Sequence, residues 1–159
     1  MPRIAATVRR MVAEGHDVAN HSWTHANLGG GGPAATSELS RTSAAIERAT
    51  GQRPCLFRAP YGSVGSDLIN RARKLGMLTI QWSADPLNWR RPGADVIASR
   101  LLAQASPGGI LLMHDGGGDR SQTLAALPQV IAGLRERGYE MVSLTDLLGL
   151  DGERGWPDA

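Results

Sequence analysis

Two histidines stand four residues apart in the segment His21-Ser22-Trp23-Thr24-His25. In a turn or a helical segment this spacing aims two imidazole rings at one point, and an imidazole nitrogen binds zinc at roughly 2.0–2.1 Å. The pair is therefore a candidate metal site. The alternative is a hydrogen-bonded loop histidine beside a packed tryptophan, because two histidines at this spacing also occur by chance.

A second candidate cluster is Arg58-Ala59-Pro60-Tyr61-Gly62. Pro60 fixes its own φ and disfavours the helical region for Ala59, while Gly62 permits a tight reversal. Such a turn would hold the backbone amide near Tyr61 against a cavity, where it could donate to a developing oxyanion. The alternative is a rigid surface turn with an arginine at the end of a strand.

The third cluster is Asp85-Pro86-Leu87-Asn88-Trp89. A carboxylate directly after a buried strand, followed by a tryptophan, is typical of a site with a sugar-stacking wall. Alternatively, Asp-Pro only opens a turn and Trp89 covers the core.

The fourth cluster is Leu112-Met113-His114-Asp115-Gly116, at the end of a strongly apolar run. A histidine in this position meets a partly desolvated environment, where its proton affinity is readily tuned for acid catalysis. The alternative is a hydrogen-bonded histidine at the edge of the core.

Short β-rich runs alternate with helical patterns along the chain, which indicates a mostly parallel α/β sheet. Ser66 is the expected N-cap of the third helix and Pro128 a candidate kink in the last one. Each cluster lies at or just past the end of a different predicted strand, so the four should meet where parallel strands present their carboxyl-end loops. We predict helices over residues 4–14, 34–50, 67–75, 94–105 and 122–137, and strands over residues 17–20, 55–57, 77–82, 109–113 and 139–142.

The 159 residues suffice for one domain, which we place at residues 1–150 with a polar tail at 151–159. The net charge is +2, and the basic residues, of which Lys74 is the only lysine, are interleaved with acids. We therefore expect no nucleic-acid partner. Residues 110–113 fall far short of the roughly 20 apolar residues of a membrane span, so no membrane insertion is expected. Cys55, the single cysteine, cannot form an internal disulfide.

Taken in order, the four clusters resemble the motifs of the polysaccharide deacetylases, the NodB-homology family also called carbohydrate esterase family 4. Residues 21–25 resemble the H-[ST]-x-x-H metal motif and residues 58–62 the R-x-P-Y-G motif. Residues 85–89 resemble the D-x-x-D-W motif and residues 112–114 the L-x-H motif. The resemblance covers about residues 4–148.

The resemblance implies a distorted (β/α) barrel and a metal-dependent hydrolase. Its expected reaction removes acetyl groups from N-acetylglucosamine-containing or other acetylated polysaccharides. His21 and His25 would bind a divalent ion, usually zinc. Arg58 and Asp85 would orient and tune catalytic groups.

The resemblance also implies the contacts with substrate. The amide of Tyr61 would hold the oxyanion, Leu112 would line the pocket for the acetyl methyl group, and His114 would be the general acid toward the leaving amine. Tyr61 and Trp89 would form the walls of a sugar groove. The implied partner is an acetylated polysaccharide or oligosaccharide and the implied location is secreted or cell-envelope, with no signal peptide visible in this chain.

Two features depart from the family pattern. The family domain opens with a strand ending in T-F-D-D-G, whose aspartates are the general base and a third metal ligand, and this sequence contains no such motif. We therefore expect the domain to lack its N-terminal part, to bind metal weakly and to have little activity alone. Asn88 stands where the family usually has aspartate.

An incomplete sheet would leave an edge uncovered, so self-association through that edge is expected. The alternative functions are a catalytically inactive deacetylase-like fragment or carbohydrate-binding relic, and a purely structural α/β domain.

Overall fold

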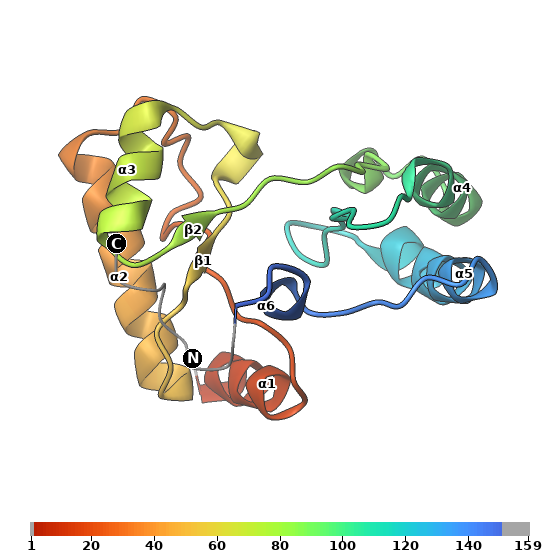
Figure 1. Ribbon diagram of the computed structural model, residues 1–159, viewed down its shortest axis with the longest axis horizontal. Coiled ribbons are helices and arrows are strands. Elements are labelled where there is room, and N and C mark those ends of the chain that lie inside the picture. Colours follow the sequence, from red (N-terminus) through yellow and green to blue (C-terminus); the bar gives the residue numbers. More distant parts are fainter. Residues whose placement is uncertain (1, 151–159) are drawn as a thin grey trace. The chain divides into compact units, whose positions relative to one another are not determined.

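The structure is a computed structural model that describes residues 2–150, and it divides into two compact units (Figure 1). Unit 1 contains residues 2–81 together with 142–150, and unit 2 contains residues 82–141. The tail predicted at 151–159 lies outside the described residues. No helix in the described range 2–150 is both long enough and apolar enough to cross a membrane.

The elements of unit 1 are α1 (Pro2–Ala13), α2 (Gly32–Thr50), β1 (Leu56–Phe57), the 3₁₀ turn η1 (Pro60–Gly62), α3 (Ser66–Lys74), β2 (Leu78–Thr79) and α6 (Leu144–Leu147). The three predicted helices of this unit are confirmed, and α6 was not predicted. The strands are shorter than predicted.

Strands β1 and β2 are parallel, with Leu56 opposite Leu78. Asn20 joins the other side of β1 by a parallel bridge to Phe57, in which the amide of Asn20 donates to Leu56 O at 2.9 Å and Arg58 donates to Asn20 O at 3.0 Å. The parallel arrangement predicted from the alternating pattern is therefore confirmed. This pairing places His21 directly after Asn20 and Arg58 directly after β1, so both residues lie at the same edge of the sheet.

The core of unit 1 lies where α2 and α3 pack against this small sheet. Its buried side chains are Leu28, Ala35, Leu39, Phe57, Ala59, Leu68, Ala72 and Met77.

The start of α3 differs from prediction. Ser66 is the first helical residue, and the N-cap position belongs to Gly65, with no side-chain cap bond. A Cβ at residue 65 would lie 2.5 Å from the carbonyl oxygen of Gly29, so the chain needs glycine where two backbone segments meet. Close packing against that loop, which sequence alone does not reveal, decides where this helix begins.

Unit 2 consists of the 3₁₀ turn η2 (Asn88–Arg90), α4 (Ala94–Gln104) and α5 (Ser121–Glu136). The two long helices lie side by side (Figure 1) and enclose a small core. Helix α5 continues through Pro128. The core residues are Ala84, Ile97, Ala98, Leu101, Ala126, Val130 and Leu134.

Three predicted strands are not formed as strands within the described residues: 17–20, of which only Asn20 pairs, 109–113 and 139–142. Of residues 109–113, only Leu111 pairs, through a parallel bridge to Ala84. Tyr139 packs on the core of α4 and α5, whereas Met141 and Val142 stay 44% and 48% exposed. The apolar pattern of residues 139–142 thus reflects one partly buried ring and not a buried strand.

Candidate active site

His21 is oriented by the backbone of the residue that follows β1. Its Nδ1 lies 2.5 Å from the carbonyl oxygen of Arg58. Because a carbonyl oxygen can only accept, Nδ1 carries the hydrogen and the lone pair of the neutral ring is on Nε2. Histidines that bind metals are usually oriented in this way, with the second nitrogen donating to a carbonyl or a carboxylate.

His25 is brought to His21 by a turn and not by a helix. Ser22 and His25 have positive φ values of 67° and 60°, and the amide of His25 donates to the Ser22 hydroxyl at 3.0 Å. The two imidazole centroids are 4.9 Å apart, with the rings edge to face at 79°. The structure therefore brings the two predicted metal ligands together.

Asn20 anchors the start of this loop and was not among the predicted site residues. Its side chain is fully buried. The amide nitrogen donates to Leu39 O at 2.8 Å and to the Ser43 hydroxyl at 2.9 Å, and the amide oxygen accepts from the backbone of Ser22 at 3.0 Å. An asparagine at the end of a predicted strand was the available sequence signal.

Glu38, on α2, anchors the middle of the same loop and was also missed. Its carboxylate accepts from the amides of Trp23 and Thr24 at 2.9 and 2.8 Å, and from the Thr24 hydroxyl at 3.0 Å. The bond from the Thr24 amide is the main reason that the pKa of Glu38 is lowered. The guanidinium of Arg41 lies 4.1 Å from the centre of the Trp23 ring.

The two histidines fit part of a zinc site. Each can offer a ring nitrogen, whereas catalytic zinc is typically held by three protein ligands. Within residues 2–150, the structure has no cluster of three His, Cys, Asp or Glu side chains able to hold a metal ion. The described residues therefore offer two candidate ligands for such a site.

The turn at residues 58–62 lies beside the histidines. Tyr61 adopts φ 60° and ψ 9°, a region that is strained for a residue other than glycine. Its ring centre is 4.9 Å from that of His25, and its side chain is 71% exposed. The side chain of Gln81 donates to Gly62 O at 3.1 Å, which connects the turn to the segment that follows β2. Burial lowers the pKa of Arg58.

In unit 2, Asp85 shapes the loop that follows the first extended segment. Its carboxylate accepts from the amide of Leu87 at 2.8 Å, and Leu87 has φ 55°. The side chain of Gln104 bonds both backbone groups of Asp85, at 3.0 and 3.2 Å. This predicted catalytic residue is thus part of a fixed turn, which positions the residues after it.

One of those residues, Asn88, contacts His114 directly. Its Oδ1 lies 2.9 Å from His114 Nδ1, and its Nδ2 donates to His114 O at 3.1 Å and to the Thr123 hydroxyl at 2.8 Å. Asn88 is 1% exposed. Sequence reasoning identified position 88 only as a departure from the family pattern. Of the predicted substrate contacts in this unit, Leu112 is buried and Trp89 is 47% exposed.

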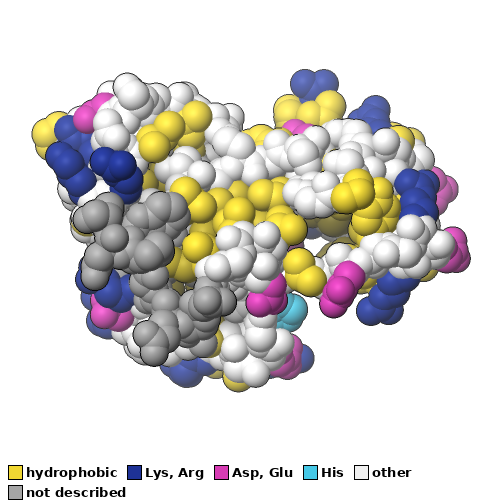
Figure 2. Space-filling model, viewed as in Figure 1, with side chains coloured by type: hydrophobic (Ala, Val, Ile, Leu, Met, Phe, Trp, Pro, Cys, Tyr) yellow, Lys and Arg dark blue, Asp and Glu magenta, His cyan; other side chains and the backbone are white. Residues whose placement is uncertain are grey.

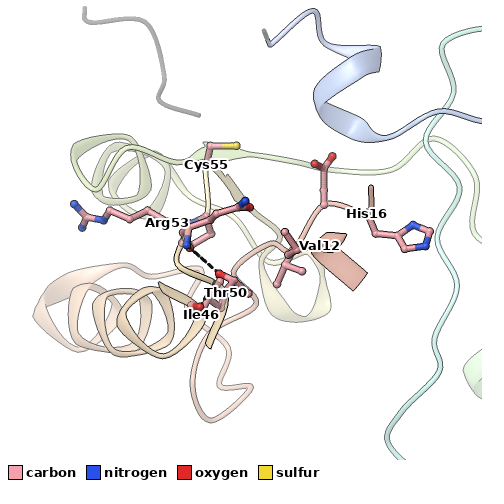
Figure 3. Close-up of a pocket in the computed structure, with 10 residues that line it drawn as sticks. Val12, His16, Ile46, Thr50, Arg53 and Cys55 are labelled. Atoms are coloured by element: carbon pink, nitrogen blue, oxygen red, sulfur yellow. Dashed lines mark hydrogen bonds between the residues drawn. The ribbon is translucent and has the colours of Figure 1, made fainter. Parts of the chain in front are cut away.

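A separate small cavity lies near the start of β1 (Figure 3). It is lined by residues that include Val12, His16, Thr50, Arg53 and Cys55, and its volume is about 40 Å³. Since about 10–15 Å³ is the least that a cavity needs to hold one water, this cavity has room for water but not for a sugar ring. Cys55 precedes β1 whereas Arg58 follows it, so this cavity is not the site described above.

Known proteins that are similar to this chain show which family it belongs to. The model of the family described as "Polysaccharide deacetylase" matches residues 3–80. A chitooligosaccharide deacetylase of a Bradyrhizobium species is 43% identical over 153 residues, which cover 88% of this chain and 70% of that protein. The chain belongs to the polysaccharide deacetylase family. The resemblance inferred from the four motifs is confirmed.

Other members of the polysaccharide deacetylase family are also similar. A peptidoglycan-N-acetylglucosamine deacetylase of Bacillus cereus is 32% identical over 143 residues, which cover 89% of this chain and 67% of that protein. The crystal structure of a CE4 family pseudoenzyme from Bacillus anthracis matches with a TM-score of 0.84 at 33% identity, over 92% of this chain and 51% of that one. The chain thus spans about half of that solved structure.

These likenesses confirm the predicted fold class, a NodB-type α/β fold of which this chain covers a part. The polysaccharide deacetylase family is metal-dependent in general.

Proposed function

We propose that this chain carries the metal and acid motifs of a hydrolase that removes acetyl groups from N-acetylglucosamine units of a polysaccharide. The proposal rests on the contacts among three rings in unit 1. His21, His25 and Tyr61 form a chain of edge-to-face contacts, each at 4.9 Å, and the Arg58 carbonyl leaves the lone pair of His21 on Nε2.

The metal of this proposal is a zinc-type divalent ion held by His21 and His25. When bound, such an ion lowers the pKa of a bound water and polarises the acetyl carbonyl. Arg58 has the role of orienting and tuning the catalytic groups, and the backbone amide of Tyr61 donates to the oxyanion.

The second set of roles belongs to unit 2. His114 gives a proton to the leaving amine, since an amine leaves poorly without one. Leu112 lines the pocket for the acetyl methyl group, and Asp85 fixes the turn from which Asn88 reaches His114. The exposed rings of Trp89 and Tyr61 offer apolar faces on which a sugar can stack.

The substrate class follows from the relatives, which include a chitooligosaccharide deacetylase and a peptidoglycan-N-acetylglucosamine deacetylase. A chain of N-acetylglucosamine units is common to both. An enzyme acting on such a polymer would work outside the cell or in the cell envelope. On the face shown in Figure 2, Lys and Arg side chains are scattered among acidic and uncharged ones.

A second candidate function is a non-catalytic, sugar-binding relic of the enzyme. Two observations favour it: a pseudoenzyme is among the similar solved structures, and the described residues supply two metal ligands.

The test is acetate release from a chitin tetrasaccharide with added zinc or cobalt. It compares this chain with a chimaera in which a family member's segment carrying the T-F-D-D-G motif precedes it. We expect little release from the chain alone and turnover by the chimaera that is lost in His21→Ala. A folded, zinc-loaded chimaera that binds the sugar without turnover would favour the relic.

A further inference from the structure

The segment of unit 2 between His114 and α5 contains three consecutive glycines, Gly116, Gly117 and Gly118. We call residues 115–119 the glycine loop. Gly117 and Gly118 have positive φ values of 79° and 119°, which other residues rarely adopt. Because glycine has no side chain to pack and many backbone conformations open to it, a contact from outside the glycines is needed to hold this loop in one shape.

The side chain of Arg120 makes that contact. Its Nε donates to Gly116 O at 2.8 Å and its Nη2 donates to Gly117 O at 2.9 Å. Its Nη1 donates to Trp89 O at 3.4 Å, on a different segment of the chain. The carbonyl oxygen of Arg120 accepts from the Leu124 amide at 3.0 Å, so α5 anchors the residue itself. One planar guanidinium thus closes the glycine loop and joins it to the backbone of Trp89.

Other bonds join the same two segments beside this contact. Arg91 and Asp119 form an exposed ion pair at 3.7 Å, and the amide of Gly93 donates to the side chain of Gln122 at 2.7 Å. An exposed ion pair at this distance contributes little to stability. Neither bond touches the three consecutive glycines, so Arg120 holds the part of the loop that these bonds do not reach.

We propose that Arg120 is a positioning residue that holds the glycine loop and Trp89 together as a preformed surface for a sugar unit of the polysaccharide. The hold on the loop follows from the contacts alone, whereas the arrival of a sugar at this surface rests on the proposed function. A loop that was not held would have to become ordered when the saccharide binds, and this ordering would lower the affinity. Arg120 therefore acts on saccharide binding and not on proton transfer.

The contact requires an arginine and not only a positive charge. In Arg120 three different nitrogens of one rigid plane donate to three carbonyl oxygens. The ammonium group of lysine carries its donors on one atom at the end of a flexible chain, so it cannot span the three oxygens in the same way. Arg120→Lys therefore keeps the charge and removes the geometry.

The first experiment is NMR relaxation of the 159-residue chain labelled with ¹⁵N-glycine, and it needs no enzymatic activity. In the wild type, Gly116, Gly117 and Gly118 should have order parameters close to the roughly 0.85 of a rigid backbone. In Arg120→Lys they should fall toward the flexible range, below about 0.6. Arg135→Lys, at an exposed arginine of α5, is the matched control and should leave them unchanged.

Two results of this measurement would overturn the proposal. One is a wild type in which the three glycines are already flexible, and this result does not depend on any variant. The other is an Arg120→Lys protein in which they stay as rigid as in the wild type.

The second experiment measures kinetics of the active chimaera with a chitin tetrasaccharide. Arg120→Lys should raise KM by about 3- to 10-fold, because the loop must then become ordered on binding, and should affect kcat much less. Arg135→Lys should change neither constant. An unchanged KM, or a fall in kcat as large as the rise in KM, would contradict a role of Arg120 in saccharide binding. Absence of turnover in the chimaera would count against the proposed function and leave the glycine measurement standing.

Discussion

The carbonyl oxygen of Arg58 lies 2.5 Å from Nδ1 of His21. The residue that follows β1 therefore orients a candidate metal ligand on the neighbouring segment of the chain. This contact uses the backbone of Arg58 and not its side chain. Two of the family motifs, far apart in sequence, are therefore joined by a bond that depends on parallel pairing around Asn20 and Phe57.

The histidine pair should bind zinc weakly, with each ring contributing. We expect His21→Ala and His25→Ala to lower the affinity for zinc by a similar factor, measured by calorimetric titration. His16→Ala, which removes a histidine outside the pair, is the matched control and should bind zinc as the wild type does. Equal affinity in all four proteins would remove the metal assignment.

Glu38 should make the stability of the histidine loop depend on pH in the acid range. Hydrogen bonds from the loop lower its pKa below the ordinary 4.5. A group whose folded pKa is depressed contributes stability above its unfolded pKa and loses it as the pH falls through the folded value. The contribution should therefore be fully present well above pH 4.5 and be lost progressively as the pH falls below 4.5 and through the folded pKa.

The measurement is urea unfolding of the wild type and Glu38→Gln between pH 3 and 7. The variant should be less stable at pH 7, and the difference should shrink toward pH 3. Glu140→Gln, at an exposed glutamate, is the control. A constant difference across the range would contradict the role given to Glu38.

The close approach at Gly65 should make alanine costly there. A Cβ at that position would lie 2.5 Å from a backbone oxygen of Gly29, whereas one at Gly30 would meet nothing within 4 Å. We expect Gly65→Ala to lower the free energy of unfolding by about 1–3 kcal/mol and Gly30→Ala to change it little. Chemical denaturation of both variants tests this, and equal stability would show that the loop yields without cost.

His114 should be needed for the amide substrate and much less for an activated ester. In the active chimaera, His114→Ala should lower kcat for N-acetyl substrate by about 10²–10⁴-fold, because the amine must be protonated to leave. An acetyl ester with a good leaving group needs no such proton. Metal content should stay unchanged. Equal losses with both substrates, or loss of zinc with the histidine, would contradict the role of general acid.

The sequence predicted those parts of the fold that local patterns determine. Helical periodicity placed α2 and α4 within a few residues, and Gly51 ends α2 in the left-handed conformation expected of a C-terminal glycine. Contacts between distant residues could not be predicted in this way. Glu38 reaches residues fourteen and fifteen positions earlier, and Asn88 reaches residues twenty-six and thirty-five positions later.

The differences in the strands and helix ends have the same origin. A strand ends where its neighbour stops pairing, so residues 109–113 shrink to one bridge at Leu111 although their composition is strongly apolar. Ser66 has the residue type of an N-cap, but the backbone of Gly29 requires a glycine just before it. In both places a neighbouring backbone outweighs local propensity.

The loop that carries the two histidines takes its shape from α2. The side chains of Glu38 and Ser43 and the carbonyl oxygen of Leu39 all bond the loop or its first anchor, Asn20. Grafting the five-residue motif alone onto another scaffold would therefore transplant the ligands without their geometry. The smallest portable unit is the loop together with this stretch of helix and the end of β1, because the carbonyl oxygen of Arg58 orients His21.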